Sequence, residues 1–360
     1  MPQQSMPFSE QLVKITEWWD RKNKRPLLLL GVCAPHAPVL DMNLFWPAPD
    51  AEPDIEGMVR AQIQMAQCGY NLVDSLPSCI GHSWGSRGTP MTMSAYLGGN
   101  VKFGATTVWV EPMVKDWDKF PMNFDAGNPW VRRSRRLLEA QVRLCPDGCL
   151  PVTPDYGDAL TVFSLLRGTE RLLLDLVEQP DLIERKVREY VAVWIEAHRY
   201  FWDIYHTRFP GDCSCLGWAP GKTYICQSDF STMISPAMFR RFVVPEIERL
   251  GGYLEYMPWH LDGPEEIKHL DALLALPQIR AIQIQSGANR PPCASPLWLP
   301  QAKKIQVHGR CLMVYANTLV ELETLLDVLA PEGLQIGVGC SFADPGQAEP
   351  FLRAFRRRYG

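Results

Sequence analysis

The sequence predicts one α/β domain, a closed (β/α)8 barrel of the TIM type, and three observations support this expectation. Strand-like and helical segments alternate four times from Tyr253 onward. Each helical crossover returns the chain to the same end of a sheet, so the strands should run parallel. The G-x-G-x-x-G turn of an open dinucleotide-binding sheet is missing. The length of 360 residues suits a single barrel domain, with residues 1–25 as an N-terminal helical extension.

The first half of the chain combines apolar strand-like segments with long amphipathic helices. Strands are predicted at Leu27–Val32, Tyr70–Val73, Thr107–Val110 and Cys213–Trp218. Helices are predicted at Ser9–Lys22, Ile55–Cys68, Pro129–Leu144, Arg167–Val177 and Pro180–His206. The Gly- and Pro-rich segment Cys79–Trp130 predicts long loops over the C-terminal mouth of the barrel.

In the second half each predicted strand is followed by a helix. The strands are expected at Tyr253–Trp259, Ala281–Gln285, Lys304–Val307 and Leu334–Val338. The helices are expected at Glu265–Ala275, Pro296–Ala302, Leu319–Leu329 and Gln347–Arg357. A further helix over Ala237–Leu250 has Ser235 as its N-cap and Pro236 in its first turn.

Charge and composition exclude several classes of partner. The chain has 36 Lys plus Arg against 40 Asp plus Glu, so it lacks the basic excess of a nucleic-acid-binding protein. No apolar run approaches the ~18 residues of a membrane span, and Met1–Glu10 does not have the pattern of a signal peptide. We therefore expect a cytoplasmic protein that binds a small-molecule substrate and could form a homodimer. The 11 Cys residues are expected to be reduced thiols.

Ligand-type side chains follow two of the predicted strands. His260 and Asp262 come directly after one strand, and Cys340 follows the last. In a barrel the carboxyl ends of the strands surround one mouth, so the three side chains could reach a single ion. An imidazole, a carboxylate and a thiolate form a plausible zinc shell with one position open. The alternative is that His260 and Asp262 hydrogen-bond each other or the backbone while Cys340 packs as a small apolar residue.

Other polar and aromatic residues near the predicted mouth are candidates for substrate binding. Gln283 and Gln285 alternate with isoleucines, so both amides should point into the barrel and need hydrogen-bonding partners. Tryptophan faces could stack on a sugar ring or a methylammonium group. The alternative for each is ordinary packing of a loop or core residue. The candidates are Asp74, His82, Trp84, Trp218, Tyr224, Trp259, Gln283 and Gln285.

Three stretches of the chain resemble the uroporphyrinogen decarboxylase superfamily. The most specific is Gln227–Pro245, which contains Ile234-Ser235-Pro236. The others are Leu166–Glu170, followed by Pro180-Asp181-Leu182, and Trp259–Gly263 before a helix. The resemblance covers most of the chain from about residue 70 and implies a (β/α)8 barrel.

The superfamily has two branches, and the sequence resembles the second more closely. The decarboxylase branch binds its tetrapyrrole with an N-terminal Arg-rich motif, whereas Arg25-Pro26 here leads only into a run of leucines. The other branch transfers methyl groups from a corrinoid protein, using zinc held by H-x-C and a later Cys. This resemblance implies zinc ligands at His260 and Cys340, with Asp262 in place of the first Cys. A carboxylate keeps the formal charge of the shell but is a harder ligand than a thiolate.

The resemblance therefore implies a zinc-dependent methyltransferase that acts on a small molecule and has a corrinoid protein as partner. The residues leave two alternatives open. One is a lyase or hydrolase on a sugar-like or carboxylated substrate, with His260 and Asp262 as the catalytic acid and base. The other is a protein that binds a small molecule without turnover.

Overall fold

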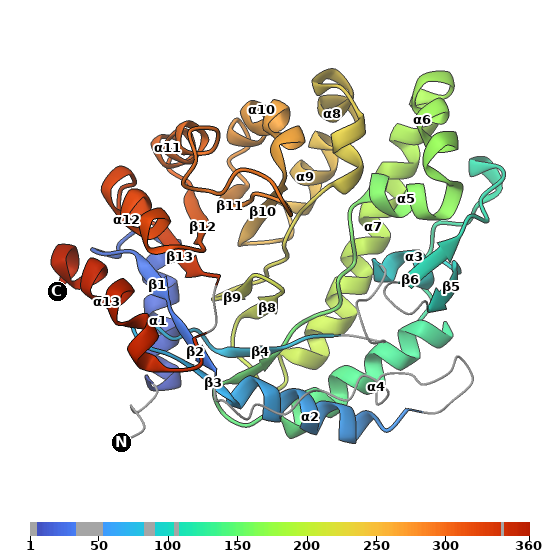
Figure 1. Ribbon diagram of the computed structural model, residues 1–360. Helices are drawn as coiled ribbons and strands as arrows, with labels where there is room; N and C mark the ends of the chain where they lie inside the picture. Colours follow the sequence, from blue (N-terminus) through green and yellow to red (C-terminus); the bar gives the residue numbers. More distant parts are fainter. Residues whose placement is uncertain (1–5, 34–52, 83–90, 104–107, 340–341) are drawn as a thin grey trace.

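The computed structural model describes residues 6–33, 53–82, 91–103, 108–339 and 342–360, and its centre is a parallel sheet (Figure 1). Five strands lie in the order β1-β13-β12-β11-β10, and every neighbouring pair is parallel. The bounds are β1 (Leu27–Leu29), β10 (Met257–Asp262), β11 (Ile279–Gln285), β12 (Cys311–Ala316) and β13 (Leu334–Val338). The expected α/β architecture with parallel strands is confirmed.

Shorter parallel segments continue this sheet beyond β10. Thr223 and Cys226 form parallel bridges to Tyr256 and Trp259. The strands β4 (Ser78–Ile80) and β7 (Cys149–Pro151) pair in parallel, and Thr153 donates its backbone N–H to the carbonyl of Cys213 in β8 (Asp212–Ser214). Three antiparallel pairs complete the strands: β2 (Gly31–Cys33) with β3 (Gly69–Asn71), β5 (Asn100–Phe103) with β6 (Val108–Glu111), and β8 with β9 (Gly217–Ala219).

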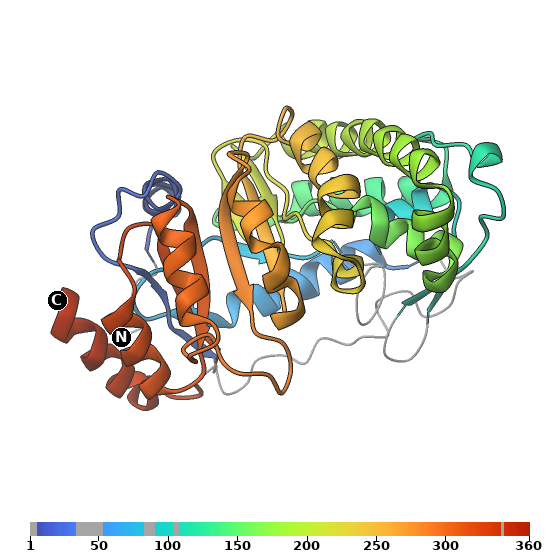
Figure 2. The ribbon, with the colours of Figure 1, turned by 90° about the horizontal axis from the view of Figure 1, so that it is seen from above.

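Helices cover the outer side of this curved arrangement of strands (Figure 1). The α-helices are α1 (Phe8–Trp19), α2 (Ile55–Gln67), α3 (Thr92–Tyr96), α4 (Pro129–Leu144), α5 (Ala159–Arg167), α6 (Thr169–Glu178), α7 (Pro180–Tyr205), α8 (Pro236–Phe242), α9 (Val244–Leu250), α10 (Leu270–Leu274), α11 (Leu299–Val307), α12 (Leu319–Val328) and α13 (Pro345–Tyr359). The 3-10 helices are η2 (Trp117–Lys119), η3 (Asp229–Met233) and η4 (Pro264–His269). Both views place α13 and the long α7 on opposite sides of the molecule (Figures 1 and 2).

The long helices begin and end where their local sequence predicts. Asn128 caps α4 by accepting the N–H of Trp130, and Pro129 occupies the first turn, where a missing N–H has no consequence. Its buried residues include Val131, Leu138 and Val142, which lie on one face at helical spacing. The predicted N-terminal helical extension is also present as α1.

One predicted strand is wrong. Residues Lys304–Val307 are the last turn of α11, and the strand is β12, which begins at Cys311. Between them Gly309 has a φ of 73°, a backbone conformation that ends the helix and turns the chain back to the sheet. Both segments are short apolar runs, which periodicity alone does not assign.

Other elements differ from the prediction in their extent. The helix expected over Ala237–Leu250 is divided at Val243 into α8 and α9, because Pro245 has no backbone N–H to donate to the preceding turn. Gly217, with a φ of 113°, turns the predicted strand Cys213–Trp218 into the β8–β9 hairpin. The region Cys79–Trp130, expected to be irregular, includes α3 and the hairpin of β5 with β6.

Among the described residues, no helix is both long enough and apolar enough to cross a membrane.

Candidate functional site

The candidate site lies at the carboxyl ends of the neighbouring strands β10, β11 and β12 (Figure 1). Side chains alternate along β10: Trp259 and Leu261 are fully buried, His260 is partly exposed and Asp262 is exposed. His260 and Asp262 therefore share one face of the strand, as the sequence predicts from their spacing. The opposite face packs into the core.

His260 is held by a chain of two hydrogen bonds that crosses the sheet. Its Nδ1 lies 2.5 Å from Oε1 of Gln283 on β11. Nε2 of Gln283 donates to the hydroxyl of Tyr315 on β12 at 2.5 Å. Because the Gln283 oxygen can only accept, this hydrogen bond requires the proton on His260 Nδ1, which in a neutral ring leaves the lone pair on Nε2. That nitrogen is available to bind a metal ion or to accept a proton.

Two further carboxyl groups interact electrostatically with His260. Asp155 follows β7, and its Oδ1 accepts a hydrogen bond of 2.6 Å from the hydroxyl of Tyr224. Asp229 lies in η3 and is exposed. Burial raises the pKa of Asp155, while Tyr224, the Gly157 N–H and His260 lower it. Desolvation raises the pKa of Asp229, opposed by His260 and reinforced by other carboxylates.

The group therefore combines one imidazole with three carboxyl groups: Asp155, Asp229 and Asp262. Glu266 in η4 is a fourth acidic residue nearby; its side chain is 1% exposed, and burial raises its pKa to about 9. Such a buried carboxyl is neutral near pH 7. Carboxyl groups at different ionisation states around one imidazole can move protons or attract a cation.

Of the predicted substrate-binding residues, Tyr224 and Gln283 lie within this group through the hydrogen bonds just described. Gln285, two positions after Gln283 on β11, pairs in register with Asp262. Asp155 and Tyr315 are not predicted from the sequence. The available signal for both is their place after or at the end of a short apolar strand, which is where a barrel carries its site.

Asp74 lies in a separate ion-pair network. Its carboxylate accepts two hydrogen bonds from Arg25, at 2.6 and 2.9 Å, one from Lys14 at 3.1 Å and one from the N–H of Leu28 at 3.0 Å. The side chain is 1% exposed. These contacts tie α1 and β1 to the segment after β3, and they supply a structural role for Asp74.

His82 is buried behind the strands, close to α7. Its ring centroid lies 6.3 Å from that of Phe201, and among the described residues neither ring nitrogen has a hydrogen-bonding partner. Burial lowers its pKa to about 3, so the ring is neutral. Trp84 and Cys340, which the sequence analysis assigns to substrate and metal, lie outside the described residues.

The two described tryptophan candidates are core residues. Trp259 is 1% exposed, and its ring meets that of Phe239 in α8 edge to face, on the side of β10 opposite to His260. Trp218 is 6% exposed and donates its indole N–H to the carbonyl of Pro210. Packing explains both positions.

Within the part of the chain that the structure describes, no three His, Cys, Asp or Glu side chains are grouped to hold a metal ion. His260 and Asp262 belong to that part, whereas Cys340 does not. The three-ligand zinc shell thus stays a prediction from the sequence.

A second pair of buried carboxyl groups lies beneath the site, at the start of α5. Asp158 caps α5 by accepting from the N–H of Thr161, and Glu246 of α9 accepts from the N–H of Ala159. Burial raises the pKa of Asp158 to about 7, and the charge of Asp229 adds to this rise; burial and the charge of Asp158 raise the pKa of Glu246 well above its usual range. The pair is most stable when it keeps a proton.

This pair predicts a pH dependence of stability. Folded carboxyls with raised pKa values bind protons that the unfolded chain has already released, so the free energy of unfolding should fall as the pH rises from about 5 to about 8. Each affected group contributes up to about 1.4 kcal/mol per pH unit. Chemical denaturation of Glu246→Gln should show a smaller slope. Glu248→Gln, exposed on the same helix, should keep the slope of the wild type; equal slopes in all three proteins would refute the prediction.

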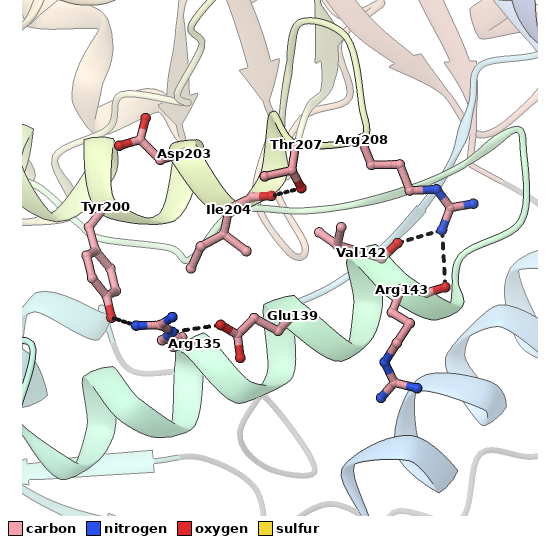
Figure 3. Close-up of a pocket in the computed structure, with 9 residues that line it drawn as sticks. All are labelled: Arg135, Glu139, Val142, Arg143, Tyr200, Asp203, Ile204, Thr207 and Arg208. Carbon is pink, nitrogen blue, oxygen red and sulfur yellow. Dashed lines mark hydrogen bonds and ion pairs between the residues drawn. The ribbon is translucent and has the colours of Figure 1, made fainter.

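A surface cavity of about 830 Å³ lies between α4 and α7, away from the site (Figure 3). Arg208 donates to the carbonyls of Val142 and Arg143 at the end of α4, and Arg135 contacts Glu139 and Tyr200. The arginines thus already bind partners within the protein. None of the candidate site residues that the structure describes lines this cavity.

Comparison with known proteins gives results at the level of fold. No protein-family model matches the chain, and no curated protein matches it. A methyltransferase from Methanosarcina mazei has a similar structure, with a TM-score of 0.60 and 11% identity over 97% of this chain and 99% of that one. A B12-independent methionine synthase from Shewanella sp. W3-18-1 matches with a TM-score of 0.50 and 11% identity, covering 93% of this chain and 96% of the other.

The chain thus shares the α/β fold of these two proteins along almost its whole length, and the likeness concerns the fold alone. The identities are too low to transfer an activity or a ligand set.

Proposed function

We propose that this protein is a methyltransferase built on a closed (β/α)8 barrel, acting on a small molecule at the mouth formed by β10, β11 and β12. The observation that carries the proposal is His260, which is held through Nδ1 by Gln283 and lies beside Asp262 at a strand end. The likeness to a methyltransferase over 97% of the chain supports the reaction class.

Zinc suits the donors at this position. His260 offers Nε2 as a donor atom, Asp262 offers an exposed carboxylate, and Asp155 and Asp229 are further oxygen donors nearby. Cys340, on the chain after β13, would supply the thiolate. Zinc bound there would act as a Lewis acid that lowers the pKa of a thiol, alcohol or amine acceptor.

The residues of the chain have separate tasks in this proposal. Gln283 and Tyr315 orient His260, and Tyr224 holds Asp155 in place. Asp229 is exposed like Asp262 and is not needed as a ligand, so it can take the proton that the acceptor releases and pass it to water.

A corrinoid carried by a partner protein is the methyl donor that the sequence resemblance favours. The fold by itself does not require one, because a methionine synthase that shares it is B12-independent. We propose the corrinoid protein as partner on the grounds of the sequence alone.

The second candidate function is acid–base catalysis by a lyase or hydrolase on a sugar-like or carboxylated substrate. It is favoured by the raised pKa values of Asp155 and Asp229 beside His260. Carboxyl groups tuned toward neutral pH serve as general acids, with His260 or Asp262 as the base.

Metal analysis of the purified protein separates the two functions. We expect about one zinc per chain, because one shell with an open position requires one ion. His260→Ala and Cys340→Ala should each lose most of it. His308→Ala and Cys68→Ala change residues that directly follow α11 and α2, outside the site, and these variants should keep the zinc.

Folding of each variant is checked by circular dichroism. A wild-type protein that is folded, active and free of metal would refute the zinc function and leave acid–base catalysis. A protein that binds a ligand but neither transfers a methyl group from any donor nor cleaves the bound ligand would refute both enzymatic functions.

A further inference from the structure

We propose that Gln283 and Tyr315 are positioning residues that fix the tautomer of His260, with the proton on Nδ1 and Nε2 presented to the mouth. The role of His260 as metal ligand in this scheme rests on the proposed function. The hydrogen bonds among the three residues do not depend on that function.

The three residues lie on three adjacent strands of the parallel sheet. His260 pairs in register with Gln283, and Gln283 pairs with Met313. Tyr315 lies two positions beyond Met313 and therefore on the same face of β12. Because the positions are set by strand register, the chain of hydrogen bonds has little freedom to rearrange.

Because the Gln283 amide is buried, its orientation determines which group its nitrogen and its oxygen can bond. Its side chain is 3% exposed, so both ends of the amide need protein partners. The nitrogen donates to Tyr315, which leaves the oxygen to accept from His260. A histidine that binds metal through one nitrogen usually donates its other N–H to such an acceptor, and losing that partner lowers metal affinity about 10- to 100-fold.

The ring of Tyr315 is itself positioned by a glycine. Tyr315 pairs in register with Gly337 on β13, and a Cβ added at Gly337 would lie 2.9 Å from both Cδ1 and Cε1 of the ring. Real side chains do not approach so closely, so the ring lies in the space that the missing side chain leaves. Gly337→Ala should displace the hydroxyl without removing any polar group of the chain.

Nitrogen NMR of metal-free protein labelled at histidine tests the tautomer directly, at a pH at which the rings are neutral. His260→Ala identifies the signals. We expect the wild-type ring to carry its proton on Nδ1. Gln283→Met, close in size but unable to accept the bond, should give a mixture of both tautomers, and Gly337→Ala should shift the populations in the same direction. Gln283→Glu retains an acceptor and should restore the wild-type tautomer.

Zinc titration of the same proteins gives the second readout. Gln283→Met should bind zinc about 10- to 100-fold more weakly than the wild type. Gln67→Met, exposed on α2, should match the wild type in both measurements. If Gln283→Met fails to fold, Gly337→Ala and Gln283→Glu still give the comparison.

Two results would overturn the positioning role: a wild-type ring protonated on Nε2, or tautomer populations unchanged by Gln283→Met and Gly337→Ala. A failure of the proposed function gives a different experimental result. A wild-type protein that takes up no zinc refutes the metal site, while the NMR spectra still decide the tautomer.

Discussion

Asp262→Cys is expected to keep or tighten zinc binding and to keep methyl transfer to a thiol. The substitution places a second thiolate in the predicted shell with His260 and Cys340. Thiolates are softer ligands than carboxylates and suit zinc, and the formal charge of the shell stays the same. Asp262→Asn, which keeps the shape and removes the charge, should instead weaken zinc binding by about tenfold or more. Isothermal titration with zinc and a methyl-transfer assay measure the two effects.

The opposite outcome identifies acid–base catalysis. If Asp262 transfers a proton, both substitutions should lower turnover by about 10² to 10⁴, the usual contribution of a general acid or base, with the fold intact. Asp271→Cys is the matched control, because Asp271 is exposed on α10 and forms its ion pair with Lys304 at the surface. It should change neither zinc binding nor turnover. Activity retained together with tighter zinc binding in Asp262→Cys would refute the acid–base alternative.

Asp74→Ala is expected to destabilise the protein by about 3 kcal/mol. Removing one partner of a buried ion pair typically costs about 3–5 kcal/mol, because the remaining charge is left without compensation. The side chains of Arg25 and Lys14 are 32% and 25% exposed, so water solvates part of the charge that Asp74 leaves unpaired. We therefore expect a loss of stability at the lower end of this range. The N–H of Leu28 also loses its acceptor. Urea denaturation measures the change in the free energy of unfolding.

Asp118→Ala provides the comparison at the surface. Asp118 also pairs with an arginine, Arg185, but its side chain is 65% exposed. Such pairs contribute about 0–1 kcal/mol. The sequence predicts a substrate contact for Asp74, and this role gives a different result. Asp74→Ala with the stability of the wild type and weaker substrate binding would contradict the structural role.

Several parts of the fold follow from local sequence patterns. The predicted helices at Ile55–Cys68, Pro129–Leu144 and Pro180–His206 agree with α2, α4 and α7 to within one residue at each end. Caps and helical periodicity are local signals, so they do not depend on the rest of the fold. The strand predicted at Lys304–Val307 lies instead after Gly309. Two short apolar segments in this region have similar patterns, and packing between β11 and β13 determines that Cys311–Ala316 forms the strand.

In the candidate site, too, local sequence patterns predict some features and the packing of the chain determines the others. The spacing of His260 and Asp262 determines that they share a face of β10, because side chains alternate along any strand. Which groups meet them is decided by the tertiary structure: Gln283 and Tyr315 come from the next two strands of the sheet, and Asp155 follows a strand more than one hundred positions earlier in the chain. Asp74 shows the same limit, since its partner Arg25 is 49 positions away.

The sequence by itself thus determined the parallel α/β class, the long helices and the polar residues at the end of β10. The tertiary structure decided the partners of those residues, the acceptor that faces His260 Nδ1 and the assignment of Trp259 to the core. The physical reason is that local patterns encode the period and the buried face of an element. Contacts between elements depend on strand order and register, which are set by the packing of the whole chain.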